Sequence, residues 1–172
     1  MAADSPVMLE RRRPDWTVAI VAGLAASAVL MVLDLLWSSV AEGGGPWRTS
    51  HMIAPIFTGV DTAQVSEYRF SWGVVAIALA AHYVLGMISG IVLAAIMTPM
   101  HLDTSVVKAS AIGAAFGAVI YVVNFHIATR FFPWLTELRG LPTIAAHFVF
   151  GIVMAVLYYK LGRTSSAEAR AS

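Results

Sequence analysis

Two histidines stand in the same local context, in segments that are otherwise apolar. The stretch AAHYVLGMISG covers residues 80–90 and the stretch AAHFVFGIVMA covers residues 145–155, and each begins Ala-Ala-His followed by an aromatic residue. A histidine in such a segment can hydrogen-bond across a helix interface, ligate a metal or haem iron, or relay a proton. His82 and His147 are therefore the first candidates for a functional site.

Axial ligation of haem b is the first of these chemistries to consider. Iron takes one imidazole on each face of the flat haem ring, so two histidines on facing helices can hold it. Gly86 and Gly151 each follow a histidine by four positions. Residues at this spacing share a helix face, so the glycines would leave room for the ring beside His82 and His147.

A mononuclear metal site is a variant of this idea, because imidazole with carboxylate suits zinc, copper or iron. Its candidate ligands are His82, His147, His126 and Asp34, which stand in separate segments without a diagnostic spacing.

A small proton or solute transporter is another interpretation, because a carboxylate beside a histidine can relay protons. Asp34 is the only acidic residue in the apolar segments, but it stands one turn before Trp37 and could instead reach the headgroups.

Helix packing explains the same residues without a ligand. A histidine within a membrane commonly hydrogen-bonds across an interface, and glycines four positions apart let two helices approach closely. The candidate packing glycines are Gly86, Gly90, Gly113, Gly117 and Gly151. Under this interpretation the protein is non-enzymatic, with a structural or accessory role. The sequence shows no phosphate loop, nucleophile elbow or H-E-x-x-H motif that would favour an enzyme.

Four long apolar segments must position these residues. Of the 172 residues, 59% are hydrophobic and 12% are charged, which is far from the balance of a soluble protein. Segments 16–37, 72–97, 109–128 and 141–159 are each long enough to cross a bilayer, which takes about 20 apolar residues. We therefore predict an all-α integral membrane four-helix bundle, in one domain over residues 1–172. The first segment is too long for a cleaved signal peptide.

The long loop after the first apolar segment and the tail after the last one also have features that predict their structure. The loop over residues 38–71 contains a short apolar stretch, residues 52–60, which is too short to span. We expect this stretch to lie at the membrane interface or to pack over the bundle as a lid. The small, polar residues of the tail, 162–172, predict disorder.

The distribution of basic residues predicts the orientation in the membrane. One side of the bundle would carry Arg11, Arg12, Arg13, Lys108, Lys160, Arg163 and Arg170, and the other Arg48, Arg69, Arg130 and Arg139. Because basic residues favour the cytoplasmic side, both termini are expected there. The partner expected from composition is the lipid bilayer. The net charge of +1 gives no basis for binding nucleic acid, and a homo-oligomer or a larger membrane complex stays open.

The lack of cysteine excludes disulfides, thiolate metal sites and the attachment of c-type haem.

The two halves of the chain resemble each other. GLAASAVLMVLD, residues 23–34, aligns with GAAFGAVIYVVN, residues 113–124, at an offset of 90, while His82 and His147 are 65 positions apart. This pattern predicts two pseudo-symmetric parallel helical-hairpin repeats. The repeat would place both histidines at one depth, facing each other. Asp34 and Asn124 would be equivalent too, and with His126 they would complete a polar cluster in the outer half of the bundle.

From about His51 to Gly162 the chain resembles a group of small, uncharacterised bacterial inner-membrane proteins. The resemblance is carried by HYVLGMISG, GAVIYVVNFHIATRFFPWLTELRG and AAHFVFG. Some of these proteins carry a transferred "sodium:proline symporter" label, which names a much larger transporter with many more helices. The resemblance implies a four-helix protein of the bacterial inner membrane, and it implies no activity and no functional residue.

Overall fold

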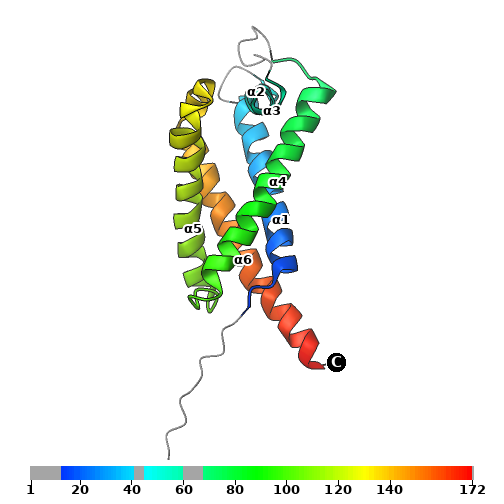
Figure 1. Ribbon diagram of the computed structural model, residues 1–172, viewed down its shortest axis with the longest axis vertical. Coiled ribbons are helices and arrows are strands. Elements are labelled where there is room, and N and C mark those ends of the chain that lie inside the picture. Colours follow the sequence, from blue (N-terminus) through cyan, green and yellow to red (C-terminus); the bar gives the residue numbers. More distant parts are fainter. Residues whose placement is uncertain (1–12, 41–44, 60–67, 172) are drawn as a thin grey trace, which may run out of the picture.

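The protein is an all-α four-helix bundle, as predicted. The computed structural model describes residues 13–40, 45–59 and 68–171, and within these ranges it contains helices and no strand. The long helices are α1 (Trp16–Val40), α4 (Trp72–Met97), α5 (Val106–Val122) and α6 (Leu141–Ala171) (Figure 1). With the turns that extend α5 to residue 130, four helices are long and apolar enough to cross a membrane.

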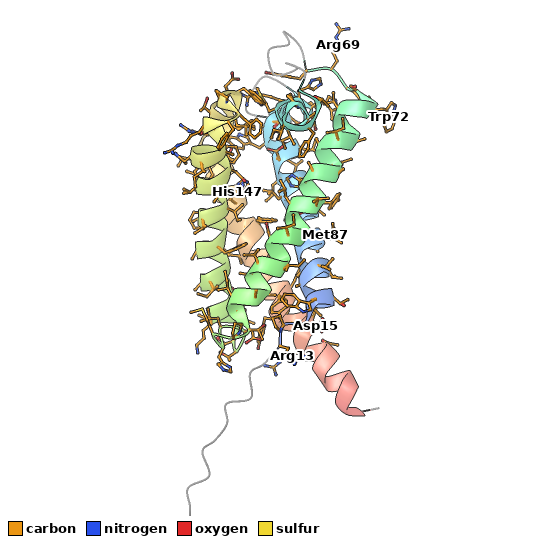
Figure 2. All side chains as sticks on the ribbon, viewed as in Figure 1. Arg13, Asp15, Arg69, Trp72, Met87 and His147 are labelled. Atoms are coloured by element: carbon orange, nitrogen blue, oxygen red, sulfur yellow. The ribbon has the colours of Figure 1, made fainter. Side chains whose placement is uncertain are left out.

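The outer faces of these helices are apolar, as the bilayer requires. Val32 and Leu36 on α1 and Val119 on α5 are all more than half exposed, at 54%, 59% and 57%. The outer faces of a water-soluble bundle would be polar, so these apolar faces indicate a bilayer environment. Figure 2 shows Trp72 pointing away from the bundle at one end and Arg13 at the opposite end.

The helices begin and end close to the predicted residues, except at the end of α6, which extends well beyond the predicted segment. α5 begins at Val106, earlier than predicted, because the Ser105 side chain caps it by accepting a hydrogen bond from Lys108 N at 3.2 Å. Residues 162–171 continue α6, where the sequence predicted a disordered tail, and Ser172 lies outside the described residues. Alanine, glutamate and arginine favour helix, and no proline interrupts them after Gly162.

Three short helices close one end of the bundle. α2 (Arg48–Ile53), α3 (Pro55–Thr58) and η3 (Pro133–Leu138) form this cover, and Figure 1 shows α2 and α3 across the upper end. Met52 is fully buried, so the short apolar stretch packs onto the bundle; its last residue, Val60, is not described. The Trp134 indole N–H donates to the Met52 carbonyl at 2.9 Å, which joins η3 to α2.

The four long helices pack as two pairs joined along α1 and α6. α1 packs against α4, α5 packs against α6, and α1 also packs against α6. By contrast, α4 and α5 hardly touch, and Figure 1 shows them diverging from their short connection, residues 98–105, toward the cover. A cavity lies in the half of the bundle nearer the cover, where these two helices are apart.

Glycines bring the backbones of α1 and α4 into direct contact. A Cβ atom added at Gly23 would overlap the carbonyl oxygen of Gly86, and one added at Gly90 would overlap the carbonyl oxygen of Ala19. Only glycine leaves room for two helices to approach this closely.

The contact between α5 and α6 is built in the same way. A Cβ atom added at Gly113 would overlap the carbonyl oxygen of Gly151, and one added at Gly117 would overlap that of His147. A Cβ atom at Gly151 would in turn overlap the carbonyl oxygen of Gly113. All five glycines proposed for packing from the sequence therefore lie at tight interfaces between helices.

Candidate functional site

A cavity of about 870 Å³ lies among the four long helices, beneath the cover. Its wall is mostly apolar, with rings from Trp37, Phe57, Phe116, Phe125, Phe132 and Phe150. The polar side chains that line it include Ser27, Asp34, His82, Ser89, Asn124 and His147. The structure therefore brings the two histidines of the repeated motif to one cavity, together with Asp34 and Asn124.

His147 is held in a defined orientation by its surroundings. It is 6% exposed, and its Nδ1 lies 2.8 Å from the carbonyl oxygen of Thr143, one turn earlier in α6. A carbonyl can only accept, so Nδ1 carries the proton and Nε2 is an acceptor. The Asn124 amide donates to Nε2 at 3.5 Å, and the rings of Tyr121 and Phe125 meet the imidazole edge-on at 5.7 and 5.5 Å. Figure 2 shows His147 in the half of the bundle nearer the cover.

A change of helix type at the end of α5 places Asn124 beside His147. Residues Val123–Ile127 form one π-helical turn, η1, and Ala128–Arg130 form a 3₁₀ turn, η2. π-Helical turns are rare and are frequent at functional sites. The carbonyl oxygen of Phe125 receives hydrogen bonds from Arg139 Nε at 2.6 Å and from the Thr129 hydroxyl at 3.2 Å. The Arg139 and Thr129 side chains thus bind the backbone at this turn.

His82 differs from His147 in its hydrogen bonding. Its Nε2 is buried and has no hydrogen-bond partner among the described residues, although its carbonyl oxygen accepts from the Ser27 hydroxyl at 3.4 Å. Buried polar atoms without a partner are uncommon in native structures, because the lost hydration is not replaced. The His82 Nε2 is therefore one place in the cavity wall where a ligand atom could form a hydrogen bond.

His126 does not join the predicted polar cluster. Its side chain is exposed and lies against the ring of Tyr121, with the centroids 5.7 Å apart. Residues two positions apart in a helix point in nearly opposite directions, so the turn that directs Asn124 into the cavity directs His126 away from it. Of the three residues in the predicted cluster, Asn124 and Asp34 line the cavity, whereas His126 is exposed and is not among its lining residues.

The geometry does not support the four-ligand metal site. Among residues 13–40, 45–59 and 68–171, no three histidine, aspartate or glutamate side chains gather closely enough to hold a metal ion. Haem b is a separate case, because it needs only the two imidazoles. Ligating histidines usually donate Nδ1–H to a carbonyl, as His147 does. However, the described lining contains no lysine or arginine to pair with the two carboxylates of haem.

Several residues of the site were not predicted from the sequence. Ser89 follows His82 by seven positions and Phe150 follows His147 by three, so helical spacing alone could have placed them on the cavity face. The cover residues Ile56 and Phe57 could not have been found in this way, because their contribution depends on how the loop folds back.

No protein-family model, curated protein or solved structure matches the chain.

Proposed function

We propose that this four-helix membrane protein binds a small, largely apolar molecule that enters its cavity from the bilayer. The supporting observation is the cavity itself, whose apolar wall and few convergent polar groups are typical of ligand sites. Its volume of about 870 Å³ is in the range found for small-molecule pockets. In this proposal the protein is a non-enzymatic accessory protein that holds its ligand.

The route into the cavity is the gap between α4 and α5. Leu85, Ile88 and Val92 on α4 line the cavity and are also exposed on the lipid side, by 54%, 51% and 43%. Val123 on the η1 turn also lines the cavity and is 40% exposed. The cavity wall is thus continuous with the lipid-facing surface, whereas the cover lies over the end that faces water.

Haem b is the second candidate, supported by the orientation of His147 and by the unpartnered His82 Nε2. His82 and His147 would hold the haem iron, and haem would supply one-electron redox chemistry. Because the described lining residues include no lysine or arginine to pair with the haem carboxylates, an apolar, uncharged molecule fits the cavity better than haem does.

Filling the cavity should block ligand entry. We expect a neutral alkyl alcohol with a photoreactive diazirine to label cavity peptides of the protein in lipid nanodiscs, in a saturable way. Ala146 lines the cavity, so Ala146→Trp should lower this labelling by roughly tenfold, the factor that follows from about 1.4 kcal/mol of lost binding. The matched control is Ala115→Trp on the exposed face of α5. Equal labelling of the two variants, measured by peptide mass spectrometry, would refute the proposal.

We also propose that the protein resides in the bacterial inner membrane with both termini in the cytoplasm. The support is the ratio of seven basic residues on the proposed inner side to four on the outer side, together with the resemblance described above. The start of α1, the 98–105 connection and the end of α6 lie at one end of the bundle, as an even number of spans requires (Figure 1).

Reporter fusions test this orientation. A cytoplasmic reporter fused after Ser172 should be active, whereas an enzyme that requires export should be active when inserted near Gly44 in the loop after α1. The reverse pattern of activities would contradict the proposed orientation.

We further propose that the hairpins α1–α4 and α5–α6 descend from one repeated unit. Support comes from the residues that meet in each hairpin. Gly23 contacts Gly86, and the residues at offsets of 90 and 65, Gly113 and Gly151, contact each other in the second hairpin. The contact between Ser27 and the His82 carbonyl corresponds in the same way to that between Gly117 and the His147 carbonyl.

A further inference from the structure

We propose that the molecule in the cavity is a neutral ring lipid that carries a carbonyl or hydroxyl oxygen, the chemistry of an isoprenoid quinone and its quinol. This inference rests on the cavity-binding function proposed above and names the class of its ligand. Three features of the cavity carry it: the hydrogen-bonding capacity of its polar residues, the charges in its lining and the aromatic rings of its wall.

The polar residues of the cavity can bind either the carbonyl oxygen of a quinone or the hydroxyl of its quinol. His82 Nε2 is buried without a partner in the described chain, so it donates to a carbonyl in one tautomer and accepts from a hydroxyl in the other. His147 Nε2 is an acceptor, because Nδ1–H is used by Thr143. The Asn124 amide adds a donor, and its 3.5 Å distance from His147 leaves it easily diverted to a ligand.

The charges in the lining exclude most other membrane lipids. Asp34 is the acidic residue among the described lining side chains, and no lysine or arginine accompanies it there. A fatty acid, a phospholipid phosphate or the carboxylates of haem would bring negative charge into an apolar cavity without a cation to pair with it. A neutral ring with an oxygen substituent avoids this cost.

The wall suits a flat ring with a hydrocarbon tail. Phe116, Phe125 and Phe150 line the cavity in the region of the histidines, and aromatic side chains pack against a flat ring by stacking or edge-on contact. The gap between α4 and α5, lined by Leu85 and Ile88, lets a tail extend into the bilayer. The ring can therefore reach His82 while the tail stays among lipid chains.

Competition against the cavity photolabel tests the inference. In nanodiscs, ubiquinone with a decyl tail should halve the labelling at a concentration about tenfold lower than decylbenzene, which has the same tail and no oxygen. A factor of ten corresponds to 1.4 kcal/mol, within the scale of one hydrogen bond. His82→Leu should remove the difference. The matched control, His126→Leu, should keep it, because His126 points away from the cavity.

Further variants keep the test decisive if His82→Leu folds poorly. His82→Gln retains a hydrogen-bonding amide and should keep most of the preference for the quinone, whereas Asn124→Leu should weaken it. If the photolabelling is saturable but the decyl quinone and decylbenzene compete with it equally well, the quinone inference is overturned, while the proposed cavity-binding function is still supported. Loss of all saturable labelling in the wild type would overturn both. A Soret band that disappears in His82→Leu would identify haem instead and overturn the quinone inference.

Discussion

Gly151→Ala should lower the free energy of unfolding in detergent by about 3 kcal/mol, at the upper end of the cost of overpacking a core. The added Cβ would overlap the carbonyl oxygen of Gly113 and lie 2.8 Å from the amide nitrogen of Gly117. Both atoms belong to the backbone of α5, so no rotamer change can relieve the overlap. The two helices would have to separate, which breaks a close backbone contact between α5 and α6. Thermal unfolding followed by circular dichroism measures the effect.

Two further glycine variants calibrate this result. Gly86→Ala should cost less than Gly151→Ala, because the nearest atom to its Cβ is the Ser27 hydroxyl, which can rotate. Gly73→Ala should be neutral or stabilising by up to about 1 kcal/mol, because nothing lies within 4 Å of that Cβ and alanine favours helix over glycine. If Gly151→Ala proved as stable as Gly73→Ala, the backbones of α5 and α6 would not be in contact.

The spans and their packing glycines were predictable because both depend on local chemistry. A bilayer leaves no water for an unpaired backbone, so an apolar segment of sufficient length forms a helix whatever its neighbours do. The spacing from Gly86 to Gly90 and from Gly113 to Gly117 identifies a smooth helix face directly. These features need no knowledge of the partner helix, and the structure places all four glycines at helix interfaces.

The details of the site depend on contacts that no local pattern records. The π-helical turn that places Asn124 in the cavity is accompanied by a hydrogen bond from Arg139, 14 positions after Phe125. The cluster prediction assigned His126 by proximity in sequence, and the direction of its side chain overrode that proximity. Similarly, the repeated motif identified His82 and His147 as a pair. Which nitrogen has a partner, however, depends on Thr143 and on the packing around α4.

Gly23→Ala and Gly113→Ala should each cost about 3 kcal/mol, because each Cβ would overlap a backbone carbonyl in its own hairpin. These glycines lie in different interfaces, so their effects should add to about 6 kcal/mol, since substitutions without shared partners are additive. That sum is comparable with the whole stability of many domains, about 5–15 kcal/mol, so the double variant should be largely unfolded in detergent.

Combining Gly113→Ala with Gly151→Ala should behave differently, because the two residues contact each other. Once one substitution has separated α5 from α6, the second meets little further resistance, so the pair should cost clearly less than the sum of its members. The two double variants contain the same kind of substitution and differ only in whether the sites share an interface. If both showed the same additivity, α1–α4 and α5–α6 would not be independent contacts, and the proposed repeat would lose its structural support.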